Sequence, residues 1–162
     1  MYKRLKVLVT LKSVIVLFAM LIAIFGGISY FSARASECSV WNRCPITQYF
    51  GQNQEHGVDL ATHGLPITAL LAGAITYDHW QCWSGECVQD ITWRLDRPAC
   101  HHGRCEPYAY VQIANSRVYV GQHVGVGTVL GSSGSFIEFG LTPDWAYGVS
   151  NWRWGIDPRF LL

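Results

Sequence analysis

The sequence predicts an all-β domain, a small antiparallel sandwich or open barrel, preceded by one N-terminal hydrophobic helix. Two observations predict the strands. Short runs rich in β-branched and aromatic residues recur along the chain and end at glycine, proline or polar turns. No long 3.6-residue periodicity appears after Phe31, which argues against further helices. The strands are expected within residues 65–77, 91–94, 108–113, 117–120, 128–130 and 136–139.

The N-terminal helix is expected to cross a membrane. Residues 13–33 carry no charge, and a helix of about 20 residues covers a hydrocarbon core of about 30 Å. Four basic residues precede the run and should stay in the cytoplasm, so the body should be extracytoplasmic: Lys3, Arg4, Lys6 and Lys12. The segment 1–35 is then either a retained anchor or a signal cleaved near Ala35, because Ala33-Arg34-Ala35 is similar to a cleavage site.

The rest of the chain has room for one domain. We expect a short stalk over 36–48 and a domain over 49–162, with an insertion at about 78–100. From residue 36 onward, seven arginines and no lysine face eleven acidic residues, which leaves a formal charge of −4. Affinity for nucleic acid depends on neutralising phosphates, so a nucleic-acid partner is excluded.

All six cysteines follow the hydrophobic run, which is typical of a chain exported to an oxidising compartment. They occur as close neighbours in sequence. Short loops favour local pairing, so we expect three disulfides: Cys38–Cys44, Cys82–Cys87 and Cys100–Cys105. A zinc site built from cysteines is disfavoured, because no C-x-x-C spacing occurs.

Five segments resemble, in order, the motifs of the lysostaphin/LytM-type zinc metallopeptidases. They are HGVDLATHGLPITA (56–69) with AGAI (72–75), HHG (101–103) with YAYV (108–111), GQHVGVGTVLGSSG (121–134), SFIEF (135–139) and DPRFL (157–161). The family patterns are H-x-G-x-D-(L/I)-A, Y-x-H-L, G-Q-x-V-x-x-G, P-H-L-H-F and D-P-x-x-(Y/F)-L. The resemblance covers about residues 50–162 and implies the fold of these peptidases.

The positions that carry the family's chemistry depart from its pattern. The resemblance implies a zinc ion held by the His and Asp of H-x-x-x-D and by the second His of H-x-H. The first His of H-x-H and the His of Y-x-H-L would act on water and on the developing charge. Here Asp59 is retained, but the other four positions are Glu55, Phe136, Glu138 and Tyr110. His56 is one residue out of register, which on a strand reverses the face.

These replacements change the chemistry expected of the site. Catalytic zinc prefers imidazole ligands, whereas Glu55, Asp59 and Glu138 offer three carboxylates. We therefore expect no zinc and no cofactor; the alternative is a hard divalent cation held by the three acids. Without a metal, converging carboxylates should raise the pKa of at least one of them. Phe136 and Tyr110 cannot replace imidazole as acid–base groups near pH 7.

The sequence therefore predicts a catalytically inactive peptidase-like domain whose groove binds a cell-wall peptide, a glycan or an envelope protein, and which regulates cell-wall hydrolysis. Its binding residues would be Glu55, Asp59, Tyr110, Phe136 and Glu138. Two alternatives stay open: a metal-dependent peptidoglycan endopeptidase with a carboxylate-rich site, and a structural envelope module. The tryptophans could also stack on sugars or dock a protein, in particular Trp80, Trp83, Trp145 and Trp152.

Overall fold

The computed structural model describes residues 38–83, 86–146 and 155–162. The chain divides into two units, 1–37 and 38–162, and every element below belongs to the second. The predicted helix over 13–33 and the cleavage point near Ala35 lie outside the described residues. Among the residues that are described, no helix has the length and apolar character needed to cross a bilayer.

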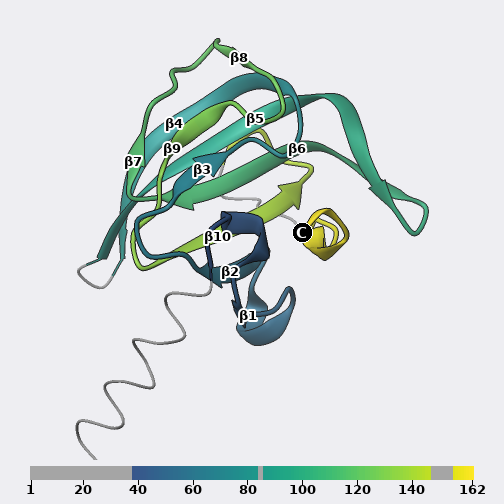
Figure 1. The fold of residues 1–162 in the computed structure, drawn as a ribbon. Coiled ribbons are helices and arrows are strands. Elements are labelled where there is room, and N and C mark those ends of the chain that lie inside the picture. The colour runs from purple at the N-terminus through teal and green to yellow at the C-terminus, as the bar shows by residue number, and fades with distance from the viewer. Residues whose placement is uncertain (1–37, 84–85, 147–154) are drawn as a thin grey trace, which may run out of the picture. The chain divides into compact units, whose positions relative to one another are not determined.

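The body consists of two antiparallel sheets, so the all-β prediction is confirmed (Figure 1). The large sheet has the order β1-β2-β10-β6-β5-β4-β8. Its strands are β1 (Ile46–Gln48), β2 (Val58–Ala61), β10 (Phe136–Thr142), β6 (Arg104–Ile113), β5 (Glu86–His101), β4 (Gly73–Trp83) and β8 (His123–Val124). The small sheet has the order β3-β9-β7, formed by Pro66–Thr68, Val129–Ser132 and Asn115–Ser116. Three short 3₁₀ turns complete the described part: η1 (Trp41–Arg43), η2 (Gln52–Gln54) and η3 (Pro158–Leu161).

The core lies on one face of the large sheet because apolar and polar residues alternate along its central strands. In the central parts of β5 and β6 and along β10 the odd-numbered side chains are apolar and buried: Ile91, Trp93, Ala109, Val111, Ile113, Ile137, Phe139 and Leu141. Successive side chains of a strand point to opposite faces, so these residues share one face. The even-numbered residues therefore share the opposite face, which is more polar.

The small sheet covers the apolar face. At Gly131 in β9 a Cβ atom would lie 1.9 Å from the backbone carbonyl oxygen of Asn115 in β7 and 2.5 Å from Ile113 Cδ1 in β6, so only glycine allows this close approach. Trp41 in η1 closes the other side of the core. Its ring packs edge-on against Phe139 at 5.4 Å, and its indole nitrogen donates to the carbonyl of Thr68 at 3.1 Å.

The structure differs from the sequence predictions in three segments: the expected stalk, the expected insertion and one expected strand. Residues 38–48, expected as a stalk, contain the buried Trp41 and strand β1, which pairs with β2. Residues 78–100, expected as an insertion, form most of the β4–β5 hairpin of the large sheet. Residues 117–120 are not a strand, so that prediction was wrong. Tyr119 and Val120 in this segment are exposed, and their apolar character does not reflect a place in the core.

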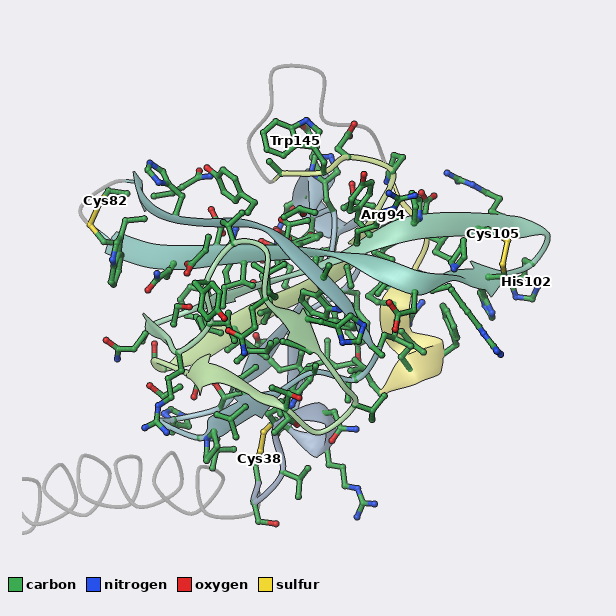
Figure 2. All side chains as sticks on the ribbon, turned by 90° about the horizontal axis from the view of Figure 1, so that it is seen from above. Cys38, Cys82, Arg94, His102, Cys105 and Trp145 are labelled. Atoms are coloured by element: carbon green, nitrogen blue, oxygen red, sulfur yellow. A yellow bond between two sulfur atoms is a disulfide. The ribbon has the colours of Figure 1, made fainter. Side chains whose placement is uncertain are left out.

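The three predicted disulfides are confirmed: Cys38–Cys44, Cys82–Cys87 and Cys100–Cys105. Cys82 and Cys87 are paired across the tip of the β4–β5 hairpin, and Cys100 and Cys105 across the tip of the β5–β6 hairpin. Figure 2 shows these two bridges at opposite ends of the long strands. At the tip of the β5–β6 hairpin residues 102–105 are exposed, so the bridge links the two strands where little apolar packing does.

Candidate functional site

Four polar side chains lie in one row across the more polar face of the large sheet. Strand register places Asp59 opposite Glu138, Glu138 opposite Gln112, and Gln112 opposite Asp90. Directly opposed residues of antiparallel strands point to the same face, so the row crosses β2, β10, β6 and β5. We call these four residues the acid row.

Three carboxylates converge at the β2 end of the acid row. Glu55, Asp59 and Glu138 each contribute an oxygen, and these oxygens lie within 4.8 Å of one another. We call these three residues the carboxylate cluster. The Tyr110 hydroxyl donates a hydrogen bond to Glu138 Oε1, and the Gln48 amide donates to Glu55 Oε2. Four of the five residues expected at the site are thus brought together.

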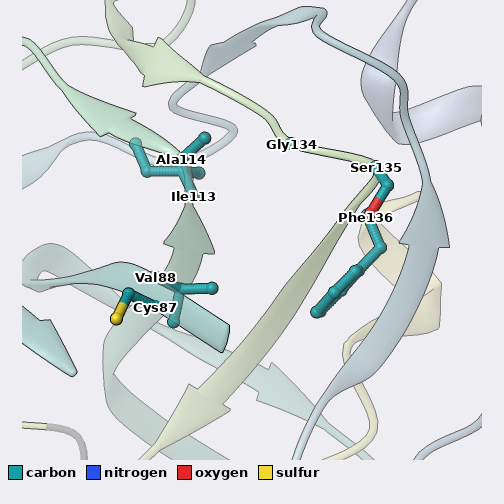
Figure 3. Close-up of a pocket in the computed structure, with 7 residues that line it drawn as sticks. All are labelled: Cys87, Val88, Ile113, Ala114, Gly134, Ser135 and Phe136. Atoms are coloured by element: carbon teal, nitrogen blue, oxygen red, sulfur yellow. The ribbon is translucent and has the colours of Figure 1, made fainter. Parts of the chain in front are cut away.

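The fifth expected residue, Phe136, lines a separate small pocket beside the cluster. Phe136 precedes Glu138 by two residues on β10, so both side chains point to the same face. The pocket has a volume of about 220 Å³ and is lined by Cys87, Val88, Ile113, Ala114, Gly134, Ser135 and Phe136. Val88 and Phe136 face each other across it (Figure 3).

Two glycines make room for the Tyr110 side chain. Gly140 is opposite Tyr110 in the sheet, and a Cβ atom at Gly140 would overlap the tyrosine ring. A Cβ atom at Gly57 would lie 2.7 Å from the Tyr110 hydroxyl oxygen and 3.0 Å from Glu138 Oε1. Tyr110 is fully buried as a result, and its hydroxyl is directed at Glu138.

Burial is the main influence on the acidity of the site. It raises the pKa of Glu138 to about 8; the Tyr110 hydrogen bond opposes the rise, and the charges of Glu55, Asp59 and Asp90 add to it. Burial, aided by the charge of Glu55, raises the pKa of Asp59 to about 6. The pKa of Glu55 is also raised by burial, against a hydrogen bond with Glu138. Near pH 7 the site therefore retains protons that free carboxyls would have lost.

Reasoning from the sequence missed the other half of the site, on β5 and β6. Asp90 and Thr92 are fully buried on the same face as the acid row, and Gln112 is nearly so. Within the described part of the chain, both Asp90 oxygens, Thr92 Oγ1 and Gln112 Nε2 have no hydrogen-bond partner. Burial raises the pKa of Asp90 to about 8; the Gln112 amide opposes this rise, although its geometry falls short of a hydrogen bond. The alternation in Asp90-Ile91-Thr92-Trp93 was the available signal.

The residues present do not fit the zinc centre that the resemblance implies. Among the described residues, the carboxylate cluster contains no imidazole, and His56 is not a member of it. Burial lowers the pKa of His56, which keeps its ring neutral at pH 7. Three carboxylates suit calcium or magnesium better than catalytic zinc, because hard cations prefer oxygen ligands. No step through zinc is therefore derived for this site.

The tryptophans divide between core and surface. Trp93 is buried, and its indole nitrogen donates to the Leu71 carbonyl at 3.1 Å. Trp80 and Trp145 are about half exposed, and Trp145 packs edge-on against Tyr77 at 6.2 Å. The Trp83 side chain and Trp152 lie outside the described part. Trp80 and Trp145 therefore keep the exposure that stacking on a ligand would require.

No family model, no curated protein and no solved structure matches the chain.

The raised pKa values predict a protein that loses stability as pH rises. Asp90 and Glu138 titrate near 3.8 and 4.5 as ordinary groups but at about 8 in the fold. Between these values the folded state holds more protons, so the free energy of unfolding should fall from pH 5 to pH 8, by at most about 1.4 kcal/mol per pH unit for each group. Urea denaturation at several pH values measures this. Glu138→Gln should flatten the slope, whereas Arg117→Gln, an exposed control whose side chain does not titrate in this range, should keep it. A stability that rises over this range would contradict the account.

Substitution of Gly140 should displace Tyr110. In Gly140→Ala the added methyl would overlap the tyrosine ring, and overpacking of this kind costs about 1–3 kcal/mol of folding stability. The matched control is Gly125→Ala, where the nearest atom to a Cβ, Thr128 Oγ1, lies 3.9 Å away. Urea denaturation should show a large loss for the first variant and a small one for the second. Equal losses would mean that Tyr110 packs elsewhere.

Proposed function

We propose that residues 38–162 form an exported domain with the scaffold of a lysostaphin/LytM-type peptidase, which binds a cell-wall component or an envelope partner without hydrolysing it. One observation carries the proposal. Glu55, Asp59, Tyr110 and Glu138 converge on one face of the large sheet, at positions where the resemblance expects zinc ligands and catalytic imidazole. Binding by such a domain could regulate the hydrolases that cut the cell wall.

The cysteines support placement outside the cytoplasm. All six are paired within the described residues, and disulfides of this kind persist in oxidising compartments. The hydrophobic run over 13–33 would hold the domain at the outer surface of a membrane as a single N-terminal anchor; after cleavage near Ala35 the domain would be secreted.

The chemistry of the site favours binding over hydrolysis. Peptide hydrolysis by a zinc enzyme requires an acidified water and a group that exchanges protons near pH 7. Tyr110 and Phe136 stand where the resemblance expects histidines. Tyr110 is buried and its hydroxyl donates a hydrogen bond to Glu138, and Phe136 has no titratable group. The acids supply hydrogen-bond acceptors and negative charge, which suit recognition of a cationic or donor-rich ligand.

A second candidate function is supported by the convergence of the carboxylate cluster itself. Oxygens of Glu55, Asp59 and Glu138 lie close enough together to hold one hard divalent cation. A metal-dependent peptidoglycan endopeptidase with a carboxylate-rich site would use this cation to activate water. A purely structural envelope module would need neither a ligand nor a metal at this face.

One sedimentation experiment separates the three functions. The full-length chain in detergent is mixed with isolated cell-wall sacculi, with and without calcium, magnesium or a chelator, and bound protein and released fragments are measured. We expect binding without release, and binding about tenfold weaker for Glu55→Gln with Asp59→Asn, which removes two charges facing the ligand. Asp96→Asn is the control. Release of wall fragments that stops when a chelator is added would establish the hydrolase. Equal binding of the unmodified chain and the double variant would favour the structural module.

The proposed descent from a zinc site predicts that metal affinity can be restored. Glu55→His combined with Glu138→His would place two imidazoles beside Asp59, a ligand set that zinc favours. Zinc affinity, measured by competition with a chelating dye, should rise at least about tenfold over the unmodified chain. The matched control, Glu55→Ala with Glu138→Ala, should not gain affinity. If the histidine variant binds zinc no better than this control, the three positions do not have the geometry of a zinc site.

A further inference from the structure

Three aromatic rings lie in a row beside β4, on the face of the large sheet that carries the acid row. In the β4–β5 pair, Tyr77 is opposite Thr92 and His79 is opposite Asp90. Opposed residues of antiparallel strands point to the same face, so both rings lie on the side of the acid row. The Tyr77 ring centroid is 5.9 Å from that of His79 and 6.2 Å from that of Trp145. We call Tyr77, His79 and Trp145 the aromatic row.

Hydrogen bonds hold the aromatic row in place while its rings stay open to solvent. The Thr76 hydroxyl donates to the backbone carbonyl of Trp145 at 2.9 Å, and the Gln81 amide donates to the Tyr77 hydroxyl at 3.4 Å. The side chains of Trp145 and His79 are nevertheless exposed. In Figure 2 the Trp145 side chain lies at the periphery of the described part, beside the long strands. A ring that is already held in position loses little conformational entropy when a ligand binds to it.

The chemistry of the aromatic row matches the two kinds of surface on a sugar ring. Each side chain has an apolar ring face and a polar group at its edge: an indole N–H, a phenol hydroxyl or the nitrogens of an imidazole. A pyranose has the complementary pattern, because C–H groups cover a face of the ring and hydroxyls point outward from its edge. The aromatic rings can therefore stack on the C–H face while their polar groups form hydrogen bonds with the hydroxyls.

A protein partner or a lipid surface fits the aromatic row less well. A specific protein interface covers roughly 800 Å² on each partner around an apolar centre. The aromatic row is a strip one ring wide, and the polar side chain of Gln81 follows His79 on the same face of β4. A segment that binds a lipid surface buries a continuous apolar face. Neither partner matches a strip in which ring faces alternate with polar groups.

We propose that the aromatic row binds a linear oligosaccharide, with the C–H face of one sugar ring stacked on Trp145. The Tyr77 hydroxyl and the His79 ring nitrogens then exchange hydrogen bonds with hydroxyls of the sugar. This inference names the ligand class for the domain's proposed function and rests on that proposal. None of the three residues belongs to the motif segments of the resemblance, so the site is carried by its own geometry.

The aromatic row and the carboxylate cluster lie at opposite ends of the acid row. His79, opposite Asp90, occupies the next position of the acid row on β4. Four strand spacings of about 4.8 Å separate β4 from β2, a total of about 19 Å. A chain of sugars stacked at the β4 end can extend toward Glu55 and Asp59, whose carboxylates accept hydrogen bonds from hydroxyls. The buried carboxyls between the two ends take no part in the binding.

Saturation-transfer NMR with two matched probes tests the proposal. The full-length chain, in a detergent without a sugar headgroup, is titrated with triacetylchitotriose and with sorbitol, which has hydroxyls but no ring face. We expect saturation to pass from the protein to the C–H protons of the trisaccharide, and sorbitol to bind at least about tenfold more weakly. No transfer to the trisaccharide, or equal affinity for the two probes, would overturn the proposal.

Two tryptophans of equal exposure locate the binding on one face of the sheet. Trp145 is 54 % exposed and Trp80 is 51 % exposed, but Trp80 is opposite Gln89 and lies on the other face of the β4–β5 hairpin. Trp145→Ala should weaken the trisaccharide about tenfold, and Trp145→Phe, which keeps a ring face, should retain most of the affinity. Trp80→Ala should leave the affinity unchanged. Far-ultraviolet circular dichroism checks that each variant is folded, and the comparison of the two probes needs no variant. Unchanged affinity in folded Trp145→Ala would contradict the proposal.

A competition experiment separates this inference from the proposed function. If sacculi bind the chain but the trisaccharide neither binds nor competes, the oligosaccharide site is wrong and the wall-binding function stands. If the trisaccharide binds and sacculi do not, the oligosaccharide site stands and its glycan belongs to a partner other than the cell wall. If neither binds, both the oligosaccharide site and the wall-binding function are wrong.

Discussion

Burial of carboxyl groups on one face of the large sheet is the constraint on which the rest of the site depends. Glu138 and Asp90 lie away from water, where an isolated negative charge is costly. Each carboxyl group must therefore keep its proton, accept hydrogen bonds or lie next to a cation. The Tyr110 hydroxyl meets part of this need at Glu138, and Gly140 and Gly57 leave the space that Tyr110 occupies. Asp90, buried opposite Gln112, meets this need by keeping its proton, because burial raises its pKa to about 8.

The same scaffold would support different chemistry with different side chains at these positions. Imidazoles at positions 55 and 138 beside Asp59 would hold zinc with an open position for water. Of the acids found there instead, Glu138 has a pKa raised to about 8 and keeps its proton at neutral pH, whereas Asp59, with a pKa of about 6, is mostly ionised and acts as an acceptor. Because the backbone pairing and the buried apolar face hold β2, β10 and β6 together, side chains on the other face could change without a change of fold. Phe136 is a further example: it stands where the resemblance expects a histidine, and its ring lines a small pocket.

The sequence predicted the fold class, the three disulfides and four side chains that come together, because each depends on local patterns. Alternation marks a strand such as β10, close cysteines pair across hairpin tips, and the motif spacing selects Glu55 and Asp59. Asp90 could not be found in this way. Its place opposite Gln112 depends on pairing between β5 and β6, and the segment that contains it was expected to be an insertion. Likewise, the apolar residues at 117–120 suggested a strand, but in the described part of the chain this segment is a connection and forms no strand.

The most direct measurement is a ¹³C carboxyl NMR titration of the full-length chain with labelled aspartate and glutamate. We expect Glu138 and Asp90 to titrate near pH 8 in the absence of metal, above Asp59 near pH 6. We also expect Glu138 to return toward an ordinary pKa when Tyr110 and its neighbours are unfolded by urea. Titration of both groups near pH 4 in the folded protein would show that they are solvated and would contradict the account.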